Sequence, residues 1–145
     1  ELFAKGINIG LGTDGAASNN RLDLLQEMRL AALLAKGRSG RADAINAHQV
    51  LRMATLGGAR ALGLEARIGS ISVGKAADLC AISINDVALA PCYDPVSHLA
   101  YAVGREHVSD VWVAGRIRVE SGQLVENNET GLIKLALLWQ NKIRP

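Results

Sequence analysis

Hydrophobic residues alternate with small or polar residues near the start of the chain, where Ile7, Ile9 and Leu11 occupy every second position. This period of two predicts a short strand. Residues 12–20 follow and are rich in glycine, serine and asparagine, which favour turns and helix caps. The pattern therefore predicts a strand that ends in a polar loop, and this loop carries Asp14.

An amphipathic helix is predicted next, because apolar residues recur at intervals of three and four between Leu24 and Ala35. Asn20 is expected to cap this helix with Asp23 three positions later, and Gly37 is expected to end it. The strand, the polar loop and the helix would form one βα unit. In parallel α/β folds the loop after a strand is where active sites are built.

A second helix is predicted after Asn46, because Asn46 and Gln49 repeat the capping arrangement ahead of an apolar run. Gly57 and Gly58 are expected to break this helix, and Gly63 is expected to stop a short continuation.

From residue 67 onward the pattern changes to short alternating runs separated by turns. Gly74 predicts a turn, residues 79–84 a strand, and residues 108–113 and 116–119 a hairpin around Ala114 and Gly115. Residues 130–141 predict a closing amphipathic helix. We expect Trp112 and Trp139 to be core or interface anchors.

Composition narrows the function classes. The chain has 145 residues, a formal net charge of +2, 49% hydrophobic residues and 3% aromatic residues. Its basic residues are scattered, whereas nucleic-acid binding is typical of clustered ones. Its longest apolar run, residues 30–35, is far shorter than the roughly 20 residues that a membrane span requires. We therefore expect no nucleic acid and no membrane as partners.

Cysteines and histidines give no metal-binding pattern. Cys80 and Cys92 are not in the spacing of a metal-binding pair, and we expect both to be reduced, which favours a cytoplasmic protein. His48, His98 and His107 are solitary in sequence, and we expect each to be structural.

Asp14 has two interpretations from local chemistry. It can cap a turn, which is common for Asp near Gly. Alternatively, residues 10–15 fit the pattern G-x-G-x-x-G of dinucleotide-binding loops. A carboxylate within such a loop would repel the pyrophosphate, and no acidic residue stands about twenty positions on, in residues 31–36. We therefore interpret the dinucleotide match as accidental.

A longer match favours a third interpretation. Residues 12–20 read Gly-Thr-Asp-Gly-Ala-Ala-Ser-Asn-Asn, and Glu-Met-Arg-Leu-Ala follows at 27–31. This stretch resembles the end of the eighth barrel strand in the metal-dependent amidohydrolase superfamily. It is most similar to the deaminases of 5-methylthioadenosine and S-adenosylhomocysteine, which are related to the triazine hydrolases. Residues 54–63 and 74–79 resemble patterns of the superfamily, and residues 93–98 also resemble this deaminase group.

The resemblance implies an α/β fold: the C-terminal part of a (β/α)8 TIM barrel plus part of a small β-sandwich domain. Residues 1–63 would be the last βα unit with connecting helices, 64–126 part of the sandwich, and 127–145 a C-terminal helix. A complete barrel needs about 250 residues, so we expect a C-terminal portion that is inactive alone. Lys75 and Asp78 would be structural residues of the sandwich.

The resemblance also implies a hydrolase that deaminates the adenine ring of 5-methylthioadenosine or S-adenosylhomocysteine. Asp14 would be the catalytic, metal-binding and substrate-binding residue, taking a proton from water activated by zinc, with iron as the alternative metal. Ser18 and Asn19 lie close to Asp14 but are expected to be loop and cap residues. The other metal ligands of the family have no counterpart in this sequence. The implied partner is a nucleoside, and a homo-oligomer is an open option.

Two alternatives remain open. A related amidohydrolase could act on a triazine, guanine or cytosine ring. A descendant without catalysis could keep the fold as an interaction module.

Overall fold

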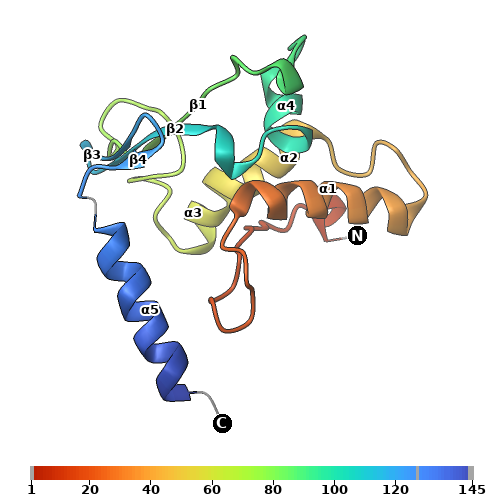
Figure 1. The fold of residues 1–145 in the computed structure, drawn as a ribbon. Helices are drawn as coiled ribbons and strands as arrows, with labels where there is room; N and C mark the ends of the chain where they lie inside the picture. The colour runs from red at the N-terminus through yellow and green to blue at the C-terminus, as the bar shows by residue number, and fades with distance from the viewer. Residues whose placement is uncertain (1, 127, 144–145) are drawn as a thin grey trace.

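Short helices and a small antiparallel sheet form the body of the chain in the computed structural model, which describes residues 2–126 and 128–143 (Figure 1). The mixed helical and sheet content predicted from the sequence is confirmed. The outer bounds of the predicted units at 1, 127 and 145 lie outside the described residues. In chain order the elements are η1 (Phe3–Lys5), α1 (Leu24–Ser39), α2 (Ala47–Arg52), η2 (Met53–Gly57), α3 (Gly58–Ala61), β1 (Leu79–Ile82), η3 (Val87–Leu89), α4 (Pro95–Tyr101), η4 (Arg105–His107), β2 (Val108–Val113), β3 (Arg116–Glu120), β4 (Gln123–Leu124) and α5 (Glu129–Ile143).

The buried core lies where α1, α2 and α4 meet. It is made of small and aliphatic side chains, since the sequence is poor in aromatic residues. Leu11, from the predicted strand, packs against this core and so links the polar loop to it. The buried members of this core are Met28, Ala32, Ala47, Val50 and Ala100.

The caps of the helices agree only in part with the sequence predictions. Asn46 and Gln49 form the predicted capping box, with both hydrogen bonds at 2.9 Å. The prediction that Asn20 caps α1 is wrong. Asp23 caps it, accepting a hydrogen bond of 3.1 Å from the backbone N–H of Gln26. Only 5% of Asp23 is exposed, and its carboxylate also forms an ion pair with the guanidinium of Arg21 at 3.3 Å.

The end of α1 lies beyond Gly37. This glycine stays helical, and Ser39 is the last residue of α1. Gly40 follows with φ +67°, the left-handed conformation that closes many helices and that glycine adopts without strain. Gly37 therefore lacks the backbone conformation that would make it the stop.

Gly57 and Gly58 do not break the second helix, contrary to the sequence prediction. The helical path continues from α2 through the π-helical turn η2 into α3. The glycines serve close packing, because a Cβ on Gly57 would collide with the carbonyl oxygen of Ile9. On the facing segment, a Cβ on Gly10 would approach the Cα of Gly58 to 2.9 Å. The absent side chains let the segment that precedes Asp14 lie directly against the helix.

A four-stranded antiparallel sheet with the order β1-β2-β3-β4 forms the other part of the body. The predicted hairpin is confirmed as β2 and β3, with Ala114 and Gly115 in the turn at positive φ. Asp78 accepts a hydrogen bond of 2.7 Å from the N–H of Ala114, which fastens the end of β1 to this turn. The expectation that Asp78 is structural is confirmed.

Lys75 is also structural, as expected. Its ammonium group donates to the carbonyl oxygen of Glu65, to the carbonyl oxygen of Ile68 at 3.2 Å and to the hydroxyl of Ser70 at 2.7 Å. The preceding Gly74 adopts φ +89° in the predicted turn. These contacts of the Lys75 ammonium group hold together the loop between α3 and β1.

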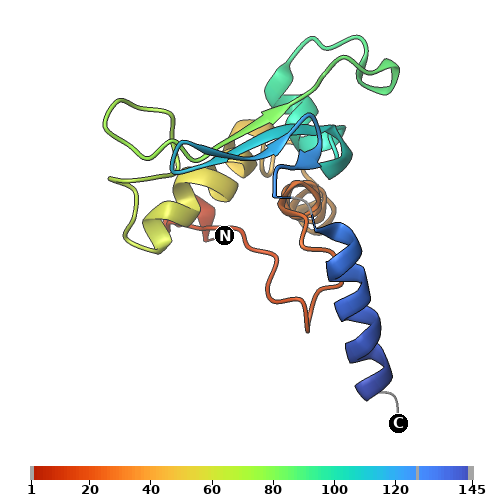
Figure 2. The same ribbon diagram turned by 60° about the vertical axis from the view of Figure 1, so that its left-hand side comes forward.

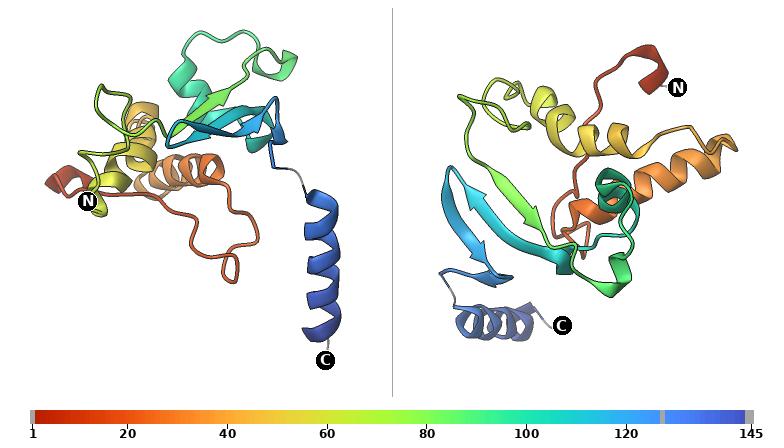
Figure 3. Two further views of the ribbon diagram at one scale, coloured as in Figure 1. Left: turned by 90° about the vertical axis from the view of Figure 1, so that its left-hand side faces the viewer. Right: turned by 90° about the horizontal axis from the view of Figure 1, so that it is seen from above.

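Helix α5 projects away from the body (Figures 1 and 2, and the left panel of Figure 3). Its apolar side chains are largely exposed, including Trp139 at 54% and Ile143 at 75%. Of the two roles predicted for Trp139, this exposure excludes the core role, and the interface role stays a prediction. Among the described residues, no helix combines the length and the apolar character needed to cross a membrane.

From the close approach between Gly57 and Ile9 we predict how substitutions of glycine change the free energy of unfolding. Gly57→Ala should destabilise the fold by about 1–3 kcal/mol, since the added methyl group meets a carbonyl oxygen that cannot move without shifting the segment. Gly37→Ala is the matched control, because a Cβ there meets nothing within 4 Å. Alanine in an exposed helix should stabilise by about 0.5–1 kcal/mol. Urea unfolding of both variants checks the opposite signs, and equal shifts would contradict the packing argument.

Candidate active site

The segment before Asp14 runs alongside the helix instead of forming a strand. Residues 7–11 have no strand hydrogen bonds, so the prediction of a strand is wrong for the described chain. The segment is held at both ends: the Asn8 side chain donates to the carbonyl of Gly57 at 2.9 Å, and the Leu11 N–H donates to the carbonyl of Met53 at 3.0 Å. A strand needs a neighbouring strand to pair with, and the described residues place only a helix here.

Asp14 lies at an exposed position in the loop that follows. It is one of the few residues other than glycine with a positive φ, +60°. Its Oδ1 accepts a hydrogen bond of 2.8 Å from the N–H of Gly15, and its carbonyl oxygen accepts one of 3.0 Å from the hydroxyl of Thr13. Its Oδ2 accepts no hydrogen bond from the residues that the structure describes. One oxygen of the carboxylate is therefore oriented, and the other is available to a ligand or a proton.

The dinucleotide interpretation of residues 10–15 receives no support from this geometry. In that motif the helix opens at the third glycine, whereas α1 begins at Leu24, well after Gly15. Within the described residues, the helix that follows this loop therefore does not present its N-terminus at Gly15, where the motif would hold a pyrophosphate.

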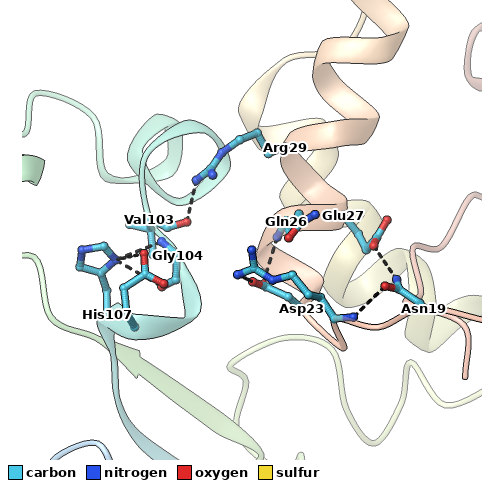
Figure 4. Close-up of polar contacts among 10 residues, drawn as sticks. Asn19, Asp23, Gln26, Glu27, Arg29, Val103, Gly104 and His107 are labelled. Atoms are coloured by element: carbon cyan, nitrogen blue, oxygen red, sulfur yellow. Dashed lines mark hydrogen bonds and ion pairs between the residues drawn. The ribbon is translucent and has the colours of Figure 1, made fainter. Parts of the chain in front are cut away.

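Asn19 connects the loop to α1 (Figure 4). Its side-chain NH₂ donates to the carbonyl of Thr13 at 2.9 Å and to the carboxylate of Glu27 at 3.0 Å. Its side-chain oxygen accepts from the N–H of Arg21 at 3.0 Å. Asn19 is thus a loop residue, as expected, and Glu27 holds it from the first turn of α1. Sequence reasoning missed this contact, because it joins residues eight positions apart across an irregular loop.

Ser18 takes part in the loop through its backbone, whose N–H donates to the carbonyl of Gly15 at 2.9 Å. This turn and the exposed side chain of Ser18 agree with the expected loop role.

The fit of a metal to this loop can be tested on its donors. An exposed carboxylate oxygen such as Oδ2 of Asp14 is a suitable zinc ligand, but zinc prefers four ligands. Within residues 2–126 and 128–143, no three His, Cys, Asp or Glu side chains come together in a way that could hold a metal ion. The described residues therefore supply one ligand of the right chemistry and not a complete site.

The histidines and cysteines occupy other positions. The ring of His98 contacts the carbonyls of Asp94 and Leu89 at 3.2 and 3.0 Å, and His107 accepts from the N–H of Gly104 at 3.0 Å, so both have the expected structural role. His48 is exposed on α2. Both cysteines are free, as predicted, and partial burial raises the pKa of the Cys80 thiol.

A groove of about 840 Å³ lies between the helices and the sheet, but Asp14 is not among its lining residues. Its lining is mostly apolar and includes Leu25, Met28, Leu62 and Val108. The described residues therefore present Asp14 on a loop at the surface and not within an enclosed cavity.

The amidohydrolase family model matches residues 1–118, and the chain belongs to this family. The chain is 46% identical over 142 residues to a 5-methylthioadenosine/S-adenosylhomocysteine deaminase of Teredinibacter turnerae, which covers 98% of this chain and 32% of that protein. It is 41% identical over 136 residues to a 5'-deoxyadenosine deaminase of Methanosarcina acetivorans, covering 94% of this chain and 31% of that protein.

Solved structures show the same relationship. A zinc-bound adenosine deaminase from Xanthomonas campestris superposes with a TM-score of 0.95 at 45% identity, covering 99% of this chain and 33% of that one. An atrazine chlorohydrolase from Arthrobacter aurescens, complexed with zinc, superposes with a TM-score of 0.86 at 30% identity, covering 94% and 30%. The chain thus spans about a third of the length of the relatives it matches.

Because Asp14 is the single carboxylate that this loop offers to a metal, we can predict the zinc affinity of the chain. We expect the chain on its own to bind zinc more weakly than micromolar, because three of four ligands would have to come from water. Equilibrium dialysis followed by metal analysis measures this affinity, with the Asp14→Asn chain as control. Retention of zinc with micromolar or better affinity that is lost in Asp14→Asn would show that the chain carries a complete site.

Proposed function

We propose that this chain is the C-terminal portion of a zinc-dependent hydrolase that deaminates the adenine ring of 5-methylthioadenosine or S-adenosylhomocysteine. The observation that carries the proposal is the identity of 46% over 142 residues with a relative of that name. The proposal extends to the architecture: residues 1–63 would supply the last βα unit of a (β/α)8 barrel, in which residues 7–11 become a strand when neighbouring strands pair with them, and residues 64–126 would supply part of a β-sandwich.

Asp14 is the residue to which the chemistry is assigned. Hydrolytic deamination needs a base that takes a proton from the attacking water and an acid that returns it to the departing amine. A carboxylate suits both steps, since it can ligate a metal and still has a lone pair that takes up and returns the proton, while the N–H of Gly15 orients its Oδ1. The same carboxylate contacts the substrate through the reacting water.

Zinc, when bound, supplies Lewis-acid activation of the attacking water. Asp14 is the one described residue that we assign as its ligand, and its exposed position leaves room for the others. The zinc-bound structures of two relatives support zinc as the metal, with iron as the alternative.

The proposed partner is a small nucleoside, and a homo-oligomer remains an option. We place the protein in the cytoplasm, since two free cysteines suit a reducing compartment.

A ring other than adenine is the second candidate. The structural likeness to an atrazine chlorohydrolase favours a triazine, and a guanine deaminase of E. coli superposes with a TM-score of 0.69 at 25% identity. Adenine ranks first because the adenosine deaminase superposes with the higher TM-score, 0.95, and the higher identity, 45%.

The test uses a chimera in which this chain replaces the matching third of the Xanthomonas campestris adenosine deaminase. We expect the chimera to deaminate 5-methylthioadenosine faster than a triazine or guanine. Asp14→Asn should lower kcat by a factor of the order of 10² to 10⁴ or more, because the proton-accepting oxygen is lost. Steady-state assays with zinc quantified alongside measure both effects.

Asp43→Asn is the matched control for this substitution. Asp43 is exposed and pairs with Arg41 at 3.0 Å, and its loss should leave kcat close to that of the unmodified chimera. If Asp14→Asn kept more than about a tenth of the activity, Asp14 would be a turn residue and the catalytic assignment would be wrong. A stable chimera that binds zinc but deaminates no adenine nucleoside would overturn the proposed reaction.

A further inference from the structure

The loop around Asp14 needs an external support, because most of it has no packing of its own. Residues 14–18 are all exposed. Asp14 also has a left-handed backbone, which side chains other than glycine adopt at a cost. The carboxylate of Asp14 can keep a fixed orientation on this loop only when neighbouring groups hold the backbone on both sides of it.

Asn19 provides this support through the peptide that precedes Asp14. The carbonyl carbon of Thr13 is one of the four atoms that define φ of Asp14. When Asn19 donates to the Thr13 carbonyl oxygen at 2.9 Å, it therefore restrains the torsion that aims the carboxylate. Asn19 is half-buried, in contrast to the exposed residues 14–18.

Only one orientation of the Asn19 amide satisfies its surroundings. Its nitrogen faces two acceptors, the carbonyl of Thr13 and the carboxylate of Glu27, and its oxygen faces one donor, the N–H of Arg21. A flipped amide would place its oxygen against two acceptors. The amide is therefore fixed in its plane.

Glu27 connects this amide to α1, which contributes buried residues to the core. It lies in the first turn of α1, next to Met28, which is 3% exposed in the core. Arg29, the following residue, donates to the carbonyl of Val103 at 2.8 Å and ties α1 to the segment after α4 (Figure 4). A helix held in this way is a fixed reference for the loop.

We propose that Asn19 and Glu27 form a positioning pair that holds the Asp14 carboxylate in its reactive direction. This inference rests on the proposed function, since it gives Asp14 the catalytic role. Neither residue of the pair touches the reacting atoms. Asn19 acts through the Thr13 peptide, and Glu27 acts through Asn19.

The test places four single substitutions in the chimera. Asn19→Asp keeps the size of the side chain but loses both donors and adds a charge beside Glu27. Glu27→Ala removes the acceptor of Asn19, whereas Glu27→Gln keeps an oxygen there. Asn20→Ala is the matched control, because Asn20 is exposed and its side chain has no hydrogen bond among the described residues.

Misplacement of a catalytic group by about 1 Å can cost of the order of 10²-fold in rate. We expect Asn19→Asp and Glu27→Ala to lower kcat by about 10- to 100-fold with KM nearly unchanged. Glu27→Gln and Asn20→Ala should stay within about threefold of the unmodified chimera, because the contact is kept or was never made. The double variant Asn19→Asp/Glu27→Ala should lose no more than the worse of its two single variants, since both residues act through one contact.

A second measurement does not depend on activity. Deuterium uptake of the peptide covering residues 12–20 should rise in Asn19→Asp and Glu27→Ala, while Glu27→Gln and Asn20→Ala match the unmodified protein. Unchanged uptake in Asn19→Asp would overturn the positioning pair, as would additive losses in the double variant.

The outcomes separate this inference from the proposed function. If Asp14→Asn abolishes turnover and Asn19→Asp does not, the positioning pair is wrong and the function stands. If Asp14→Asn is silent, the proposed catalysis is wrong, and the positioning inference falls with it whatever the loop exchange shows.

Discussion

The contact between two glycine-bearing backbones is the constraint on which the rest of the site depends. Gly57 allows the carbonyl of Ile9 to lie against the helix, and Gly10 allows the reverse approach to Gly58. Hydrogen bonds from Asn8 to the carbonyl of Gly57 and from Leu11 to the carbonyl of Met53 then fix the position of the segment along the helical turn η2. Because the chain leaves this contact only three residues before Asp14, the contact decides where the loop begins.

The loop has a second fixed end at Asn19, so Asp14 lies between two supports of different kinds. The upstream support is close backbone packing, which tolerates little change in shape. The downstream support is a hydrogen-bonded amide held by Glu27 of α1. Between them the loop stays exposed, which leaves space for other groups around the carboxylate. A rigid base with an open tip is the arrangement expected where a loop carries chemistry.

Features set by local chemistry were predictable from the sequence, and features set by tertiary contacts were not. The Asn46–Gln49 box and the hairpin at Ala114–Gly115 follow from neighbouring residues alone, and both are confirmed. Gly57 was predicted to break a helix, because the sequence alone does not show that the carbonyl oxygen of Ile9 leaves no room for a side chain at this position. Asp23 caps α1 in place of Asn20 because the helix begins at Leu24, later than the spacing of Asn20 and Asp23 predicts.

Position 14 combines a backbone requirement with a chemical one, and this decides which substitution is informative. Asp and Asn are the side chains other than glycine that enter the left-handed region most readily. Alanine at φ +60° would strain the backbone, so Asp14→Ala would mix a conformational change with the loss of the carboxylate. Glycine would release the torsion that Asn19 restrains, because it favours no single conformation. Asparagine keeps the torsion and an acceptor for the N–H of Gly15, and removes only the charge and the proton-accepting oxygen. A change in rate on Asp14→Asn can therefore be assigned to the carboxylate itself.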